Sequence, residues 1–273
     1  MTSWGWRPRL VALDIDGTLV DESGHLPEDV RESVSWALHA GARVVLSTGR
    51  GWFATRPIFE DLSLPPGPAV SSNGAVLVDY PPFQLTRVET FDPSRVIQHI
   101  AEIAPNARIA VEVIGVGFRL NKLFPHGDLQ GDMRIETIEQ LASEPASRVI
   151  IRDPDVPSEE FVKLADELGM HGVSYAIGWS NWLDIAPEGV NKASGLEQVA
   201  QRLGIAQEDV LAIGDGYNDV EMLQWAGRGV AMGNAEEGVK VHADAVTDHF
   251  DDGGTSKELR RWFREPNSSS RSA

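Results

Sequence analysis

Two carboxylates separated by a single residue stand near the start of the chain, in the run VALDIDGTL at residues 11–19. The apolar residues 10–13 are typical of a short buried strand. Because side chains alternate along a strand, Asp14 and Asp16 point to one side at its carboxyl end, where open α/β sheets bind their ligands. Neighbouring carboxylates repel each other, so the pair favours a bound cation, and oxygen ligands suit Mg²⁺. A solvated acidic turn is the alternative interpretation.

A second acidic motif, GDGYND, occupies residues 214–219 and follows the apolar run 210–213. Asp215 and Asp219 therefore flank the junction between a predicted strand and a predicted helix. From that junction both carboxylates can face the cation that the first pair favours. A helix start capped by Asn or Asp side chains is the alternative.

A hydroxyl and an ammonium group complete the set of candidates. Thr48 follows the predicted strand 43–47, and Lys192 begins a predicted helix, whose N terminus attracts anions. Phosphoryl transfer needs a nucleophile, a metal and donors for the phosphoryl oxygens, and these positions supply each of them. The alternatives are a surface lysine and a helix-capping threonine, with Ser47 as the hydroxyl in place of Thr48.

The composition narrows the classes of partner. The 273 residues carry a formal net charge of −17, which repels nucleic acid and anionic membranes, so we expect neither as a partner. The chain has no cysteine, which excludes disulfides and thiolate metal sites, and its histidines lack zinc-site spacing. No apolar run approaches the roughly 18 residues of a membrane span, and the first residues lack a signal-peptide core. We therefore expect a cytoplasmic protein; its oligomeric state stays open.

Strand and helix patterns alternate in two separate stretches of the chain. They predict an α/β core with a parallel sheet over residues 10–80 and 188–264, interrupted by an α+β insert over 81–187 that follows the YPP turn. Residues 1–9 are a predicted lead-in, and residues 265–273 a predicted disordered tail. Helices are predicted over 28–40, from after Arg50 to about Leu62, and over 93–104, 158–168, 192–203, 218–226, 234–242 and 256–263.

The motifs together, in this order, resemble the Cof-like branch of the haloacid dehalogenase-like (HAD) superfamily. The resemblance is carried by DIDGT at 14–18, LSTGR at 46–50, SNG at 72–74, GVNK at 189–192, GDGYND at 214–219 and VAMGNA at 230–235. It covers residues 10–255, with the insert matching only in placement and rhythm. It implies a Rossmann-like parallel-sheet core with an inserted cap domain of type IIB.

The resemblance also implies a role for each site residue. Asp14 is expected to attack phosphorus and form an aspartyl-phosphate, while Asp16 handles the proton of the leaving oxygen and of water. Mg²⁺ is expected to be held by Asp14, the backbone carbonyl of Asp16 and Asp215, with Asp219 in support. The expected phosphate-binding residues are Thr48, Gly49, Asn73, Lys192 and Asn218. Asn73 has a second interpretation as part of an ordinary hairpin turn.

The expected function is a Mg²⁺-dependent phosphatase acting on a small phosphomonoester, either a sugar phosphate or a phosphorylated cofactor. A phosphotransferase or mutase of the same superfamily and a non-enzymatic phosphoacceptor domain are the alternatives. In the insert, substrate contacts are candidates at Glu112, Arg119, Asn121, Trp179 and Trp182, although the two tryptophans also fit the insert's own core. The role of Arg50 is open between pairing with an acidic neighbour and lining the pocket.

Overall fold

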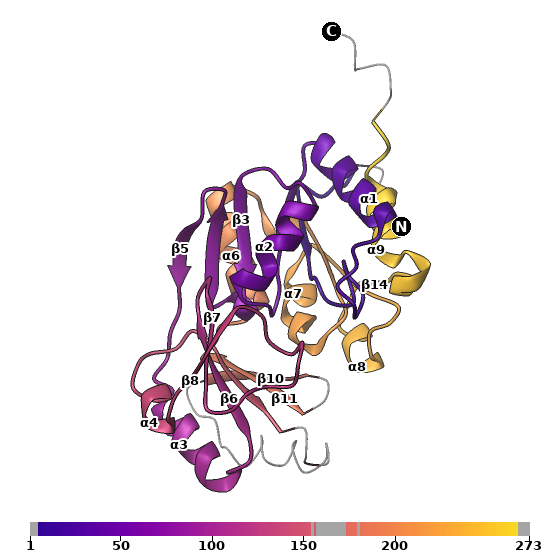
Figure 1. Cartoon of the computed structure of the whole chain (residues 1–273). Helices are drawn as coiled ribbons and strands as arrows, with labels where there is room; N and C mark the ends of the chain where they lie inside the picture. Colours follow the sequence, from indigo (N-terminus) through magenta and orange to yellow (C-terminus); the bar gives the residue numbers. More distant parts are fainter. Residues whose placement is uncertain (1–4, 154–155, 157–172, 179–180, 267–273) are drawn as a thin grey trace.

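The computed structural model describes residues 5–153, 156, 173–178 and 181–266 (Figure 1). The predicted helix over 158–168, Trp179, residues 1–4 of the predicted lead-in and residues 267–273 of the predicted tail lie outside the described residues. Among the described helices, none has the length and apolar character that a bilayer crossing needs.

A parallel sheet forms the centre of the core, with strand order β14-β13-β12-β1-β2. Its strands are β1 (Leu10–Leu13), β2 (Arg43–Leu46), β12 (Val210–Gly214), β13 (Arg228–Ala231) and β14 (Ala245–Val246). In the register, Leu13 lies between Leu46 and Ile213, so the three strands end at one edge. Their nearly continuous apolar sequences fit a sheet that is buried on both faces.

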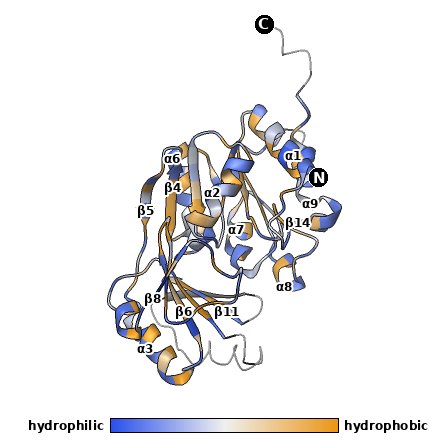
Figure 2. Ribbon diagram, in the orientation of Figure 1, coloured by the Kyte–Doolittle hydropathy of each residue, from blue (hydrophilic) through white to orange (hydrophobic). Residues whose placement is uncertain are grey.

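Helices cover both faces of this sheet, as its sequence alternation requires. On one face Val11, Leu13 and Leu46 pack against α1 (Glu28–His39), α2 (Trp52–Asp61) and α9 (Gly254–Trp262). On the other face Leu10 and Ala12 pack against α6 (Lys192–Leu203), α7 (Val220–Trp225) and α8 (Glu237–Lys240). Figure 2 shows the hydrophobic residues gathered along the strands between these helices. The fold is therefore a three-layer α/β core, as the sequence predicts.

A small antiparallel sheet extends the core beyond β2. It consists of β3 (Gly67–Ser71), β4 (Val76–Tyr80) and β5 (Gln84–Val88), and a single helical turn η1 (Ser72–Gly74) joins the first two strands. The bridge between Ser47 and Val70 links it to the end of β2. Strand β5 lies within the predicted insert 81–187, yet it pairs with β4 of the core.

The insert forms a second sheet at one end of the core (Figure 1). Its strand order is β10-β11-β9-β6-β7-β8, and all neighbours are antiparallel except β7 and β8. The strands are β6 (Arg108–Val113), β7 (Gly117–Leu120), β8 (Asp132–Ile135), β9 (Val149–Arg152), β10 (Val173–Gly178) and β11 (Trp182–Pro187). Helices α3 (Ser94–Ile103) and α4 (Ile138–Leu141) pack on one face of it. We refer to this unit as the cap.

Candidate active site

Polar side chains follow the strands of the parallel sheet at the edge where β1, β2 and β12 end together. Asp14 follows β1, Thr48 lies just beyond β2, and Asp215 follows β12. The backbone N–H of Asp14 donates to the carbonyl of Ile213 at 3.0 Å, which fixes Asp14 beside the end of β12. The parallel register thus brings together two of the sequence motifs that lie about 200 residues apart.

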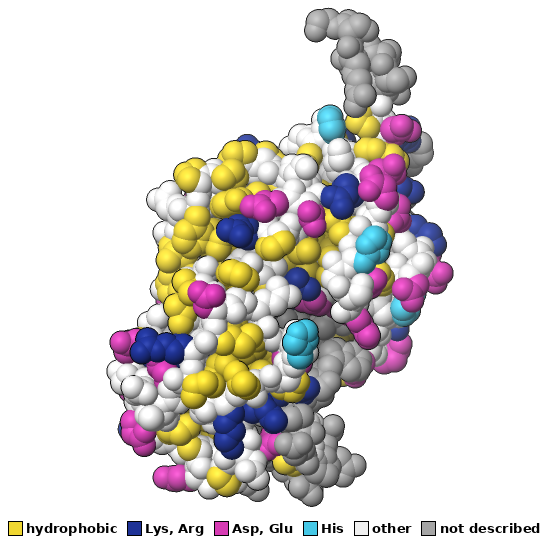
Figure 3. All heavy atoms as spheres, in the orientation of Figure 1, with side chains coloured by type: hydrophobic (Ala, Val, Ile, Leu, Met, Phe, Trp, Pro, Cys, Tyr) yellow, Lys and Arg dark blue, Asp and Glu magenta, His cyan; other side chains and the backbone are white. Residues whose placement is uncertain are grey.

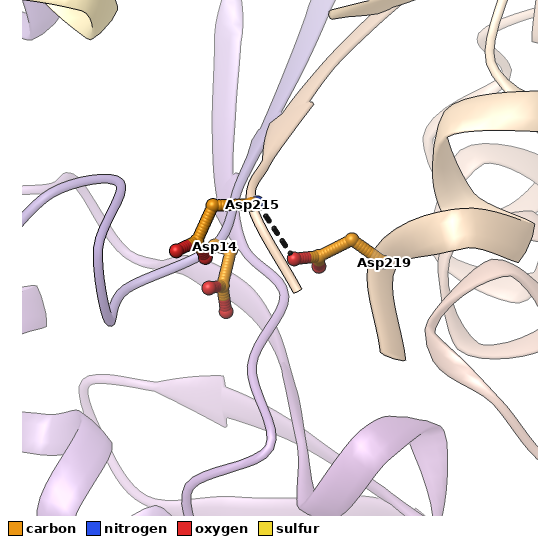
Figure 4. A group of neighbouring side chains, drawn as sticks. All are labelled: Asp14, Asp215 and Asp219. Atoms are coloured by element: carbon orange, nitrogen blue, oxygen red, sulfur yellow. Dashed lines mark hydrogen bonds between the residues drawn. The ribbon is translucent and has the colours of Figure 1, made fainter. Parts of the chain in front are cut away.

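Three carboxylates form a compact cluster at this edge. One oxygen each of Asp14, Asp215 and Asp219 lies within 4.8 Å of the others. Figure 4 shows Asp14 and Asp215 side by side at the strand ends, with Asp219 approaching from the start of the following helix. Asp219 is fixed in place because its Oδ2 accepts hydrogen bonds from the backbone N–H groups of Asp215, at 3.0 Å, and Gly216, at 2.9 Å.

Lys192 supplies the positive charge of the cluster. Its Nζ donates to Asp14 Oδ1 at 2.7 Å and to Asp219 Oδ1 at 2.6 Å, and its side chain is fully buried. Lys192 is the first residue of α6, which Asn191 caps by accepting the N–H of Ser194 at 2.9 Å. Burial lowers the pKa of Lys192, but Asp14 and Asp219 outweigh it and raise that pKa above its ordinary value, so the amine stays protonated.

The acidic groups carry more negative charge than Lys192 neutralises. Burial raises the pKa of Asp14 well above its ordinary value, and the charge of Asp219 raises it further, while Lys192 opposes the shift. Burial together with the Asp219 charge raises the pKa of Asp215 to about 7. Three carboxylates against one ammonium leave an excess of negative charge that a divalent cation neutralises.

The hydrogen bonds show which oxygens fit a cation. Both oxygens of Asp219 accept hydrogen bonds within the chain. By contrast, Asp14 Oδ2 and Asp215 Oδ1 accept none from the part of the chain that the structure describes. The donor set therefore fits a divalent cation held by Asp14 and Asp215, with Asp219 aligning Lys192 and the backbone around it.

Gly17 makes room for this arrangement. Its φ of +69° is left-handed, and a Cβ there would lie 2.1 Å from Asp215 Oδ2. The DIDG turn therefore packs its backbone directly against the second acidic motif.

Asp16 lies apart from the acidic cluster, and its side chain is 61% exposed. Arg50 holds its carboxylate in a bidentate ion pair, with Nε at 2.9 Å from Oδ2 and Nη2 at 2.5 Å from Oδ1. Arg50, whose role the sequence leaves open, thus pairs with an acidic neighbour and fixes the orientation of Asp16. The cluster of three carboxylates does not include the Asp16 side chain.

The four predicted phosphate-binding residues other than Lys192 lie together. Asn218 Nδ2 donates to Asn73 Oδ1 at 2.9 Å, and the backbone N–H of Asn73 donates to the carbonyl of Thr48 at 3.0 Å. A Cβ at Gly49 would lie 3.1 Å from Asn73 Oδ1 and 3.2 Å from Asn218 Nδ2. Thr48 is buried, and its hydroxyl accepts the N–H of Arg50 at 3.1 Å. The hydroxyl proton of Thr48 can therefore still be donated to another acceptor.

Asn234 is a site residue to which the sequence reasoning gives no role. It follows β13, and its Nδ2 donates at 3.0 Å both to Asp215 Oδ2 and to the carbonyl of Gly17. Its Oδ1 accepts the N–H of Phe250 at 3.0 Å. The signal was available, because Asn234 is a polar residue just past the end of a predicted strand of the same parallel sheet.

The candidate substrate contacts in the cap divide into two groups. Glu112 reaches the core, where its Oε2 accepts a hydrogen bond from the hydroxyl of Ser72 at 2.6 Å. Trp182 packs edge-on against Phe124 inside the cap, with ring centroids 6.2 Å apart. Arg119 pairs with Glu136 and Glu144, and Asn121 bonds the cap backbone at Ala107 and Ile109. Of these four, Glu112 is the one that the structure brings to the site.

The sequence matches a family model described as haloacid dehalogenase-like hydrolase over residues 11–259. It is also 32% identical to the pyridoxal phosphate phosphatase YbhA of Escherichia coli strain K12, over 87% of this chain and 92% of that protein.

Two solved structures have a similar fold. A phosphatase of the haloalkanoate enzyme superfamily, BT1666 of Bacteroides thetaiotaomicron, superimposes with a TM-score of 0.79 at 25% identity, covering 96% of this chain and 97% of that one. The HAD subclass IIB sugar phosphatase BT4131 superimposes with a TM-score of 0.80 at 22% identity, covering 93% of this chain and 98% of that one. The similarity to BT4131 concerns the fold, and it includes the cap.

Proposed function

Since the chain is a phosphatase that belongs to the haloacid dehalogenase-like hydrolase family, we propose that it hydrolyses small phosphomonoesters. The proposed reaction depends on Mg²⁺ and proceeds through an aspartyl-phosphate. The observation that carries the proposal is the contact between Lys192 Nζ and Asp14 Oδ1, 2.7 Å apart, inside the acidic cluster. It joins a carboxylate nucleophile, a fixed cation and a metal-binding donor set at one point.

Asp14 acts first. One of its carboxylate oxygens attacks phosphorus in line with the leaving oxygen, so a P–O bond forms to Asp14 as the bond to the leaving group breaks. Lys192 stays charged throughout and offsets the negative charge that gathers between Asp14 and the phosphoryl group. Thr48 and Asn218 donate hydrogen bonds to the phosphoryl oxygens, and Asn73 orients the amide of Asn218.

Asp16 then moves the protons. It gives a proton to the leaving oxygen, and it takes one from the water that hydrolyses the aspartyl-phosphate. The ionised Asp16 carboxylate pairs with Arg50 through two hydrogen bonds, which fix its orientation for taking the proton from water. Asp14, Asp215 and the carbonyl of Asp16 would hold Mg²⁺, which would supply polarisation of the phosphoryl group and neutralise developing charge.

The cap sets the size of the substrate. The hydrogen bond from Ser72 of the core to Glu112 of the cap holds the cap against the core beside Asn73, so the cap covers the leaving group. Compact phosphomonoesters such as sugar phosphates and phosphorylated cofactors fit this description. A cytoplasmic location stays a prediction from the sequence.

Release of inorganic phosphate is the test. We expect the purified chain to release phosphate from a panel of sugar phosphates and phosphorylated cofactors in Mg²⁺, and to stop in EDTA. D14N should abolish turnover, whereas Asp209→Asn, on the core surface far from the cluster, should retain it. Full turnover by D14N, or a sugar isomer as the product in place of free phosphate, would refute the proposal.

A further inference from the structure

A group of charged side chains lies on the face of the cap sheet opposite α3 and α4. Glu112 on β6, Arg148 just before β9 and Asp184 on β11 form what we call the cap triad. The strands β6, β9 and β11 are neighbours, and the N–H of Glu112 donates to the carbonyl of Arg148 at 3.1 Å. Arg148 Nε donates to Asp184 Oδ1 at 2.6 Å. Their neighbours Val111, Val149 and Leu183 pack on the side of α3 and α4, so the alternation of side chains along each strand points the cap triad away from the cap's own helices.

The cap triad faces the catalytic edge of the core. Glu112 is 8% exposed, and its Oε2 accepts the hydroxyl proton of Ser72, the residue before Asn73. Its Oε1 lies against Gly51, where a Cβ would come within 2.4 Å of it, so the absence of a side chain at Gly51 admits the carboxylate. Glu112 therefore contacts both loops that surround Thr48 and Asn73.

Arg148 lies within electrostatic range of Asp16. Burial lowers the pKa of Arg148, but Asp184 raises it more, and the charges of Glu112 and Asp16 add to the increase. The contact that places the cap triad is the one from Glu112 to Ser72, the neighbour of the proposed phosphate-binding residue Asn73, so the triad lies on the cap side of the catalytic edge.

The charges of the cap triad do not cancel. It holds two carboxylates and one guanidinium, which leaves an excess negative charge. The neighbouring basic groups are also paired: Arg50 with Asp16, Arg152 with Asp128 at 2.5 Å, and Lys192 with Asp14 and Asp219. Around the site, within the residues that the structure describes, no cation is left over for a second anionic group of a substrate.

We propose that the cap triad, with Glu112 as its determining residue, selects phosphomonoesters whose leaving group is neutral and bears hydroxyls, and rejects those that carry a second anion. The carboxylates accept hydrogen bonds from hydroxyls and repel a carboxylate or phosphate at the same place. The inference rests on the proposed phosphatase function and narrows its substrate class.

Two matched substrate pairs test the selection. Glycerol 3-phosphate and 3-phosphoglycerate share a three-carbon skeleton, and glucose 6-phosphate and 6-phosphogluconate share a six-carbon one; one member of each pair carries a carboxylate. In the pair that the wild type hydrolyses faster, we expect its kcat/KM to be about tenfold or more higher for the neutral member than for the carboxylate. Equal turnover, or a preference for the carboxylate, would overturn the inference.

Variants locate the selection at Glu112. E112Q removes one negative charge and should reduce the preference about tenfold, chiefly by improving turnover of the carboxylate substrate. E112D retains the charge and should keep the preference, even if its shorter side chain weakens the contact to Ser72. Glu144→Gln is the matched control, because it removes the same charge from an exposed position of the cap.

The outcomes separate the two proposals. If the wild type prefers the neutral substrates and E112Q shows the same ratio of kcat/KM values, the assignment to Glu112 is overturned. The phosphatase proposal would still stand in that case. Absence of phosphate release from every substrate would overturn both. If E112Q does not fold, as circular dichroism would show, the ratio of the wild type still tests the preference, and Asp184→Asn, which removes the other carboxylate of the cap triad, tests its source. An unchanged ratio in that variant would overturn the inference.

Discussion

Lys192 Nζ lies 2.7 Å from Asp14 Oδ1, although 178 positions separate the two residues in the chain. The same ammonium lies 2.6 Å from Asp219 Oδ1. One buried cation thus joins the end of β1, the start of α6 and the turn after β12. Four expectations follow from this relationship and from the residues around it.

Loss of Lys192 should damage both stability and turnover. K192M leaves the carboxylates of Asp14 and Asp219 buried without their cation, and breaking a buried pair in this way costs about 3–5 kcal/mol. Turnover should fall by about 10²-fold or more, because the phosphoryl charge loses a donor. Urea unfolding and phosphate release measure the two effects. Lys257→Met, at a lysine about half exposed, is the control, and an equal effect of both variants would contradict the expectation.

Substitution of Arg50 should lower turnover only through its effect on Asp16. In R50K a single ammonium cannot make the two parallel hydrogen bonds that the guanidinium makes, so the Asp16 carboxyl loses its fixed orientation. We expect kcat to fall by about 10- to 100-fold with a smaller change in KM. Steady-state kinetics with a preferred substrate measure the changes in kcat and KM separately. Arg56→Lys, a half-exposed position on α2, should leave both constants unchanged. A rise in KM without loss of kcat would show that Arg50 binds substrate instead.

A side chain at Gly17 should displace Asp215. G17A strains a backbone with φ +69° and places its Cβ 2.1 Å from Asp215 Oδ2, so the carboxylate must move. Gly24 offers a matched control, since its φ is +81° and no atom lies within 4 Å of a Cβ there. Both variants should lose about 1 kcal/mol of stability from backbone strain. We expect weaker Mg²⁺ binding, by isothermal titration calorimetry, in G17A alone; equal affinities would mean that Asp215 tolerates the displacement.

The stability of the metal-free chain should depend on pH through Asp215. The pKa of this carboxyl rises from 3.8 to about 7 on folding, so between these values the folded state holds a proton that the unfolded state has lost. Stability should therefore fall as pH rises through this window, by at most about 1.4 kcal/mol per pH unit.

Added Mg²⁺ should oppose this fall, because a cation binds the ionised carboxylates and stabilises the folded state. Thermal unfolding across the window, in EDTA and in Mg²⁺, measures both slopes. D215N removes the titrating group and controls for the repulsion that the net charge of −17 imposes; Figure 3 shows acidic side chains at many places on one face of the molecule. A pH slope in EDTA that is the same in D215N as in the wild type would exclude Asp215 as its source.

The sequence alone determined the order of strands and helices in the core and the kind of chemistry at its edge. Apolar runs such as residues 10–13 and 210–213 form strands because burial favours them on both faces, whatever their neighbours. The residues just past these strands were predictable as candidate site residues that lie together, because parallel strands end at a common edge. The predicted α/β core with an inserted cap is confirmed by the fold and by its similarity to solved structures.

Only the tertiary structure decided which distant residues meet outside that edge. Strand β5 is largely exposed, so its residues gave no apolar signal that it belongs beside β4. Arg148, just before β9, pairs with Asp184 on β11, and Glu112 meets Ser72 where the cap contacts the core. Local periodicity is encoded by adjacent residues, whereas such contacts depend on strand register and on the packing of one unit against another. No stretch of the sequence contains that information by itself.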